Sequence, residues 1–544
     1  MTIPKFRLTP VAAWVRSASL AAALTASLGL SACAQLAPAY STPAAPIPAA
    51  WPEAPAMEQE SAGSAGVVVS ARRPGASTGA STGASPAASP GASPAASAAA
   101  SATDSPAAAG SAAAGSADAS AQADDLSTVI TAPQLREVIR LALDNNRDLR
   151  IAALNIEQAR ATYRIQAAAQ LPTLTGSASD TVKRTPAQAN GGQASLARQY
   201  GVEVGVTAWE LDLFGRVRDL KDAALESYLN TEEAQRSSRL SLIAEVATAW
   251  LTLSADQAQW ELAQQTLQSQ QQTYERTLQS QQLGGASALT VAQARTTVES
   301  ARNSVASSAA QVQQDRNALT LLVGATVPAH WLPAAMTPTP AAQLQLPPQG
   351  LPSTVLQRRP DVLAAEHLLK AAHANIGAAR AALFPTISLT ATAGTASTAL
   401  SDLFKGGAWS FIPSVSLPIF DGGSSRASLA SAQAAQQIQL ATYEKTVQTA
   451  FSEVADALAV RASLAERLEA QQALVDAYQQ AYTLADARFR RGADSYLTVL
   501  DAQRSLFSAR QTLVTLRLLD QTNRITLYKV LGGGGWTSST GSGA

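Results

Sequence analysis

Two stretches of the chain, 216–282 and 424–491, contain neither proline nor glycine and carry many Ala, Gln, Ser and Leu residues with charges between them. These residue types favour helices, and about 65 residues with a rise of 1.5 Å each extend over roughly 100 Å. Globular helices average about three turns, so helices of this length are typical of coiled coils. We therefore expect two very long helices that pack against other helices.

Both long stretches end at glycine, and a second helical pattern follows each of them. The first stretch is followed by Gly284 and Gly285, and the second by Gly492. Glycine tolerates the left-handed backbone conformation that ends many helices. Asp494 and Ser495 are suitable N-cap residues for the helix that comes next. The pattern predicts two helical hairpins with glycine at their turns.

The tip of the second hairpin carries Leu497, Asp501 and Arg504 at spacings of four and three residues. These spacings place the three side chains on one face of a helix. By itself, the local pattern fits a solvated hairpin tip with an Asp–Arg pair within the helix.

Segments of about ten residues with alternating apolar and polar positions precede the long helices, at 200–211, 386–398 and 411–420. Alternation is the pattern of a strand with two different faces, and ten residues are enough for a tilted strand to cross a bilayer. A soluble sheet packed on a core is the alternative. We expect four strands in the chain, too few to close a β-barrel, so several chains would have to share one.

The chain contains an internal duplication. Residues 148–175 align with 361–388 at a constant offset of 213, and from Gly215 onward the offset is 208. A period of about 200 residues is too long for a solenoid and indicates two related halves. We expect a first repeat at 126–340 and a second at 341–535, each with a helix, two strands and a helical hairpin, and a flexible tail at 536–544.

The first 32 residues have the features of a signal peptide: a basic start, an apolar run of small residues and small residues before a cleavage site. Cys33 follows, and as the only cysteine it cannot form an internal disulfide. The Leu-Ser-Ala-Cys sequence resembles the bacterial lipobox, in which this cysteine is lipidated, although a chance thiol is the alternative.

Two segments connect Cys33 to the repeats. Residues 33–72 form an arm that would carry the lipid, and residues 73–125 are almost entirely Ala, Ser, Gly, Pro and Thr. Large apolar side chains are nearly absent from the second segment, so little offsets the entropy of ordering it. We expect 73–125 to be a disordered linker.

Charge and composition argue against nucleic-acid binding and catalysis. The 40 basic and 40 acidic residues cancel, so the chain offers no general basic field for nucleic acid. His330, His367 and His373 are the only histidines. The last two are six residues apart, a spacing that does not place two metal ligands on one helical face. We expect no enzyme activity, cofactor or metal site.

The chain from 126 to 535 resembles the TolC-like outer membrane efflux factors, in their lipoprotein (NodT/OprM-like) branch. The resemblance is carried by Leu-Asp-Leu-Phe-Gly-Arg-Val-Arg at 211–218, Arg-Pro-Asp at 359–361, Ile-Gly-Ala-Ala-Arg at 376–380, Phe-Pro-Thr at 384–386, Leu-Pro-Ile-Phe-Asp-Gly-Gly at 417–423 and Leu-Tyr-Lys-Val-Leu-Gly at 527–532. No single segment is specific to this family. All of them together, in this order and within a duplicated chain, are highly specific.

The resemblance implies an α+β membrane protein, a homotrimer whose four strands per chain share a 12-strand β-barrel in the outer membrane. It also implies a long α-barrel of 12 coiled-coil helices in the periplasm. The implied function is a passive exit channel for small molecules such as drugs, as the outer membrane component of a tripartite efflux pump. Its implied partners are a periplasmic membrane fusion adaptor, an inner-membrane pump of the proton-driven RND type and outer membrane lipid.

Three alternatives stay open: an exit duct for type I secretion or metal efflux, a pore-free periplasmic coiled-coil scaffold, and a trimeric surface stalk. A scaffold of the adaptor kind has one hairpin, whereas this chain has two, and the duplication does not favour a stalk.

The resemblance also assigns a periplasmic gate to the hairpin tips. Leu497 and Asp501 match positions of an aliphatic constriction and an aspartate ring, and Arg504 matches a basic residue in the contacts that hold the tips together. Phe489 stands where many relatives carry a tyrosine. Three carboxylates converging on an axis would repel one another and attract cations, and an apolar ring can gate by dewetting.

Overall fold

The computed structural model describes residues 36–48, 51, 130–189, 191–336 and 353–533. The expected signal peptide, the lipidated Cys33, the linker at 73–125 and the tail at 536–544 lie outside the described residues. Part of the N-terminal arm is described.

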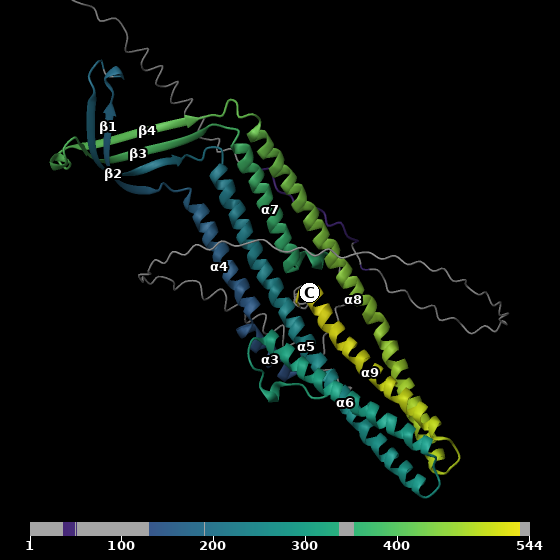
Figure 1. Cartoon of the computed structure of the whole chain (residues 1–544). Coiled ribbons are helices and arrows are strands. Elements are labelled where there is room, and N and C mark those ends of the chain that lie inside the picture. Colours follow the sequence, from purple (N-terminus) through teal and green to yellow (C-terminus); the bar gives the residue numbers. More distant parts are fainter. Residues whose placement is uncertain (1–35, 49–50, 52–129, 190, 337–352, 534–544) are drawn as a thin grey trace, which may run out of the picture. The chain divides into compact units, whose positions relative to one another are not determined.

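Each repeat contains helices, an antiparallel strand pair and a long helical hairpin (Figure 1). The first repeat consists of α3 (Pro133–Asn145), α4 (Arg147–Ala168), β1 (Leu174–Thr185), β2 (Ser195–Glu210), α5 (Arg216–Gln282) and α6 (Ala288–Val323). The second consists of α7 (Pro360–Ala381), β3 (Thr386–Ser397), β4 (Gly407–Ser416), α8 (Ser424–Arg490) and α9 (Tyr496–Val530). Short 3-10 helices lie at Ala187–Ala189, Ala329–Trp331, Ser353–Arg358 and Leu400–Asp402.

The lengths of equivalent elements confirm the duplication. Helices α4 and α7 both have 22 residues, and α5 and α8 both have 67. The two long helices begin at equivalent glycines, Gly215 with φ of 79° and Gly423 with φ of 92°. The left-handed conformation of these N-cap glycines lets the chain turn from the sheet into the helix.

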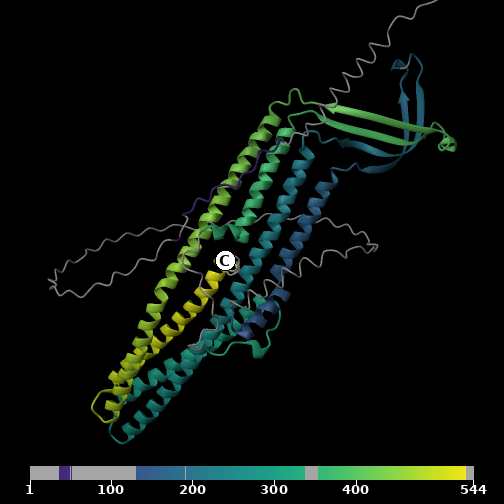
Figure 2. The same cartoon turned by 180° about the vertical axis from the view of Figure 1, so that it is seen from behind.

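The strands form one antiparallel sheet in the order β1-β2-β3-β4, at the opposite end of the helices from the hairpin turns (Figures 1 and 2). The central pair, β2 and β3, joins the two repeats through pairs such as Val202 with Thr395. The register shifts between Val206 and Trp209, and Ala208 there has a φ of 50°. A bulge of this kind bends the strand and increases its twist.

The predicted strand at 411–420 is displaced in the structure. β4 runs from Gly407 to Ser416, and its last pair joins Ser416 to Thr386, the first residue of β3. The physical reason is that β3 begins directly after Pro385, so residues beyond Ser416 have no strand with which to pair. Pro418 also lacks the N–H that a ladder needs.

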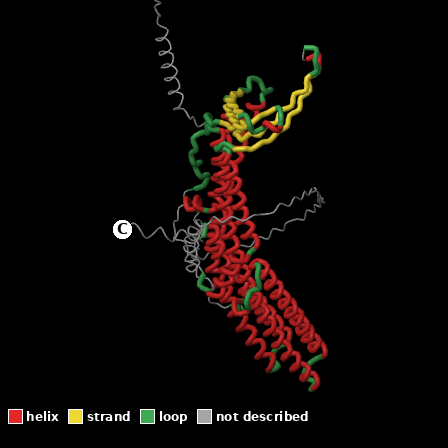
Figure 3. The backbone as a smooth tube through the Cα atoms, turned by 90° about the vertical axis from the view of Figure 1, so that its left-hand side faces the viewer, coloured by secondary structure: helices red, strands yellow, loops and turns green. Residues whose placement is uncertain are grey.

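The helices pack side by side over most of their length (Figure 3). The largest cluster of buried apolar residues joins α3, α5, α6 and α9 and includes Leu135, Ile139, Leu251, Leu253, Leu319 and Ile525. A second cluster joins α7, α8 and α9 and includes Val362, Tyr443, Val447, Val454 and Leu527. Among the described residues, no helix is both long and apolar enough to cross a membrane.

The described part of the N-terminal arm, residues 36–48 and Trp51, lies against the second repeat. The Tyr40 hydroxyl donates to Glu366 Oε1 at 3.1 Å. Trp51 stacks on Phe451 with ring centroids 4.8 Å apart. These contacts attach the chain on the C-terminal side of Cys33 to α7 and α8.

Candidate functional site

The two hairpin turns use left-handed glycines, as the sequence predicts, although not at all three positions. Gly284 has a φ of 79° and Gly492 a φ of 73°. Gly285 has no positive φ, but a Cβ at its position would lie 2.9 Å from the Ser280 hydroxyl. Gly285 therefore leaves room for the Ser280 side chain, whereas Gly284 and Gly492 reverse the chain.

The two returning helices are capped differently. Ser287 Oγ accepts a hydrogen bond from the Thr290 N–H at 3.1 Å, which satisfies one of the free donors of α6. Ser495 occupies the N-cap position of α9, but its side chain makes no capping bond. Asp494 is paired with Arg488 at 2.5 Å. The predicted side-chain cap by Asp494 or Ser495 is therefore wrong, because the Asp494 carboxylate pairs with Arg488 and the Ser495 hydroxyl makes no capping bond.

A small apolar cluster joins the two hairpins near their tips. Its buried members are Ala294, Ala485, Tyr496, Val499 and Leu500, with Tyr274, Tyr482, Phe489 and Ala502 packed against them. The Tyr482 hydroxyl lies 3.3 Å from Ser269 Oγ, a polar contact between α8 and α5. Phe489 meets Tyr496 with ring centroids 5.5 Å apart. Phe489 therefore makes an apolar contact within its own chain.

The other three candidate gate residues point to solvent. The side chain of Leu497 is 55 % exposed, and Asp501 and Arg504 are exposed on the same face of α9. Leu289, the equivalent of Leu497 in the first repeat, is 68 % exposed. In the described part of the chain, neither Asp501 nor Arg504 makes an ion pair, so the Asp–Arg pair of the alternative interpretation is absent.

The three histidines have ordinary structural contacts. His367 Nδ1 lies 2.6 Å from Glu226 Oε2, His373 Nε2 lies 3.2 Å from Gln436 Nε2, and His330 packs against the ring of Trp331. Across the described ranges, no group of three or more His, Cys, Asp or Glu side chains is placed to hold a metal ion.

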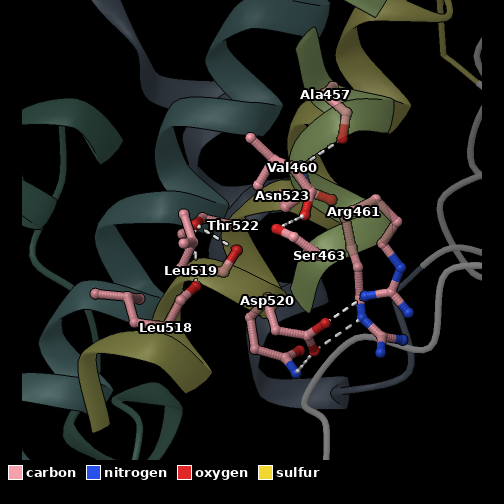
Figure 4. Close-up of polar contacts among 11 residues, drawn as sticks. Ala457, Val460, Arg461, Ser463, Leu518, Leu519, Asp520, Thr522 and Asn523 are labelled. Atoms are coloured by element: carbon pink, nitrogen blue, oxygen red, sulfur yellow. Dashed lines mark hydrogen bonds and ion pairs between the residues drawn. The ribbon is translucent and has the colours of Figure 1, made fainter. Parts of the chain in front are cut away.

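The structure contains a buried polar network between α8 and α9 that the sequence did not predict (Figure 4). Asp520 accepts hydrogen bonds from Arg461 and from Arg524 Nε, the second at 3.1 Å. Asn523 Nδ2 donates to the Ala457 carbonyl at 3.0 Å. In the sequence, only the i,i+4 spacing of Asp520 and Arg524 indicates an ion pair here, since Arg461 is 59 residues from Asp520.

Comparison with known proteins gives consistent matches over the two repeats. The family model described as outer membrane efflux protein matches residues 138–325 and 351–533. The probable efflux pump outer membrane protein TtgC of Pseudomonas putida is 49 % identical over 412 residues, which cover 75 % of this chain and 84 % of TtgC. The outer membrane protein OprJ of Pseudomonas aeruginosa is 43 % identical over 413 residues, covering 75 % and 86 %.

Solved structures match the same region. A membrane protein from Pseudomonas aeruginosa has a TM-score of 0.73 at 43 % identity, covering 75 % of this chain and 92 % of that one. The open state of the Neisseria gonorrhoeae MtrE outer membrane channel has a TM-score of 0.66 at 36 % identity, covering 75 % and 91 %. With the fold, the duplication and these matches in agreement, the chain belongs to the outer membrane efflux protein family.

Proposed function

We propose that this chain forms, as a homotrimer, the outer membrane exit channel of a tripartite efflux pump and gives small molecules a passive path out of the cell. The observation that carries the proposal is the pairing of a four-stranded sheet at one end of the helices with two helical hairpin tips at the other. Family membership supports the outer membrane location and the efflux role.

The free edges of the sheet support assembly. β1 and β4 are its outer strands, and apolar side chains such as Val182, Trp409 and Val415 are exposed on them. Unpaired strand edges cannot remain in lipid, since their backbone groups would lack partners. In the proposed trimer, each β1 pairs with the β4 of a neighbouring copy, and three sheets of four strands make one closed sheet of twelve.

The names of the relatives guide the choice of substrate. They include a toluene efflux pump protein, a solvent efflux pump protein and an antibiotic efflux pump protein, all from Pseudomonas putida. We therefore favour small, largely apolar molecules over proteins or metal ions. The proposed partners are a periplasmic membrane fusion adaptor and an inner-membrane pump of the proton-driven RND type, which would supply the energy.

The proposed gate lies at the tips of the second hairpin. Leu497 would form an apolar ring, Asp501 a ring of carboxylates and Arg504 a polar contact between neighbouring tips. Their exposure and their lack of ion pairs with other described residues support this assignment, because residues that contact another copy must first be available. Phe489 would support the tip from within, through its contact with Tyr496.

Single-channel conductance in planar bilayers tests both the channel and the gate. Purified wild-type protein is compared with Asp501→Ala and with Asp148→Ala, which removes an exposed carboxylate from the first turn of α4. We expect Asp501→Ala to open several-fold more often and to lose cation preference, because the carboxylate ring attracts cations. Asp148→Ala should match the wild type.

Other outcomes separate the two parts of the proposal. Unitary steps that are the same in all three proteins would retain the channel and reject Asp501 as a gate residue. Proteins that insert into the bilayer but never conduct would contradict the channel itself.

We also propose that Cys33 is lipidated and that the arm ties this anchor to the folded body. The contacts of Tyr40 and Trp51 with the second repeat support the tie. Mass spectrometry of the mature N-terminus should show an acylated cysteine, and Cys33→Ser should abolish palmitate labelling. An unmodified cysteine in membrane-purified protein would contradict the assignment.

A further inference from the structure

A cavity of about 680 Å³ lies on one side of α9, between α3, α5, α8 and residues 334–336. Its volume is in the range of pockets that hold small organic ligands.

Positive charge dominates the polar lining. Arg461, Arg517 and Arg524 line the cavity, whereas Asp520 is the only acidic residue that lines it in the described part of the chain. Asp520 bonds to both Arg461 and Arg524, as Figure 4 shows for Arg461. One carboxylate balances only one of three guanidinium groups, which leaves two positive charges in the cavity.

Among the described residues, Arg517 is the arginine of the cavity that has no counterion. Its Nη2 donates to Gln472 Oε1 at 3.0 Å, and within the described ranges it makes no ion pair. Burial lowers the pKa of its guanidinium. A partly buried cation without an anion is unfavourable, and an added anion would relieve this cost.

Gln134, Ser254, Gln472 and Gln521 add polar groups to the lining, and the rest of the wall is apolar. It includes Trp250, Leu251, Leu468 and Leu513. The Trp250 indole N–H donates to the Trp331 carbonyl at 3.0 Å, so the ring is held in a fixed orientation. A ligand that fits must therefore combine an acidic group with an apolar body.

Not every cavity along α9 has a positively charged lining. A second cavity, of about 790 Å³, is lined from α9 by a different set of residues, among them Thr522, Thr526 and Lys529. Its charged lining also includes three acidic residues, Glu245, Glu453 and Asp456. An anion is thus favoured in one cavity and disfavoured in the other.

We propose that the α9 arginine pocket, the cavity lined by Arg461, Arg517, Arg524 and Asp520, binds a small organic anion with an apolar body. Arg517 binds the acidic group, and Arg461 and Arg524, held in place by Asp520, add to the positive field. The apolar part lies against Trp250 and the leucines.

Isothermal titration calorimetry of the full-length protein in lipid nanodiscs tests this site with naphthalene-2-sulfonate. The uncharged naphthalene-2-sulfonamide has the same apolar body and serves as the comparison ligand. We expect one sulfonate bound per chain, with an affinity at least about tenfold higher than that of the sulfonamide, because a charge-assisted hydrogen bond is lost with the charge.

Three variants make the test specific. Arg517→Gln should weaken sulfonate binding about tenfold or more. Arg510→Gln is the matched control, because Arg510 also lies on α9 and donates to a glutamine of α8, Gln479, but lies outside the pocket lining. Ala465→Trp fills the pocket from an exposed position and should abolish binding without removing a charge.

The proposal is overturned if sulfonate and sulfonamide bind equally, if neither binds, or if Arg517→Gln and Arg510→Gln weaken binding to the same extent. Loss of binding in Ala465→Trp protein that still forms the native oligomer supports the site even where Arg517→Gln fails to fold. Because binding is measured without transport, this result is independent of the channel experiment.

Discussion

Replacing Asp219 by asparagine should stabilise the protein at neutral pH and leave its stability at pH 4 almost unchanged. Asp219 lies near the start of α5 and is only 1 % exposed. A Cβ at Gly377 would come within 2.1 Å of Asp219 Oδ2 and 2.8 Å of Ala37, so the carboxylate is enclosed by α7 and the N-terminal arm. Among the described residues, neither of its carboxylate oxygens has a hydrogen-bond partner.

The size of the expected stabilisation follows from the pKa of the Asp219 carboxyl. Burial raises the pKa of Asp219 from 3.8 to about 6; Arg218 opposes the shift, and Asp222 and Asp212 add to it. The unfolded chain therefore releases this proton near pH 4, while the folded chain retains it until about pH 6. Stability is lost as the pH rises through this window, by about 3 kcal/mol per chain at about 1.4 kcal/mol per pKa unit.

The assay is denaturant unfolding at pH 4.0 and pH 7.5, followed by tryptophan fluorescence. The Asp219→Asn variant should be more stable than the wild type by about 3 kcal/mol at pH 7.5, because the amide is never ionised. Glu261→Gln, which changes an exposed acid of the same helix, is the control and should behave like the wild type. If Asp219→Asn follows the wild type at both pH values, Asp219 is not a buried ionisable group.

Four further variants test the turns and the core. Ser287→Ala should destabilise the protein by about 1 kcal/mol, whereas Ser495→Ala should have almost no effect, because only the first serine caps its helix; thermal unfolding of both proteins compares them, and equal losses would contradict the assignment. Gly492→Ala should cost about 1 kcal/mol, since its φ of 73° disfavours a side chain; limited proteolysis should then cut the turn faster, and an unchanged rate would argue against strain. Arg359→Met should lower the free energy of unfolding by about 3 kcal/mol, because it removes a buried guanidinium that bonds to two carboxylates and a backbone carbonyl. Urea unfolding measures the loss, and a stability equal to that of the wild type would show that these bonds make no net contribution to stability.

The sequence predicts the helices of this protein better than its strand ends and polar contacts. The absence of proline and glycine from α5 and α8 is a local property, and it determines where both helices begin and end. The end of β4 depends instead on where Thr386 begins the neighbouring strand, which the β4 sequence does not contain. Likewise, the chain around Asp520 cannot reveal that Arg461 will meet it. The exposure of Leu497 and Asp501 agrees with the predicted face, while their role as a gate stays a prediction.

The equal length of α5 and α8 restricts how the two halves can have diverged since they arose from one ancestor. One inserted residue turns everything beyond it by about 100° around the helix axis, which would move every buried side chain out of its cluster. Neither helix shows a net gain or loss of residues relative to the other, since both have 67. The strands are less restricted, and β2 has 16 residues where β4 has 10. Insertions and deletions have thus accumulated in the sheet, where a bulge can absorb an extra residue, whereas the long helices have changed by substitution.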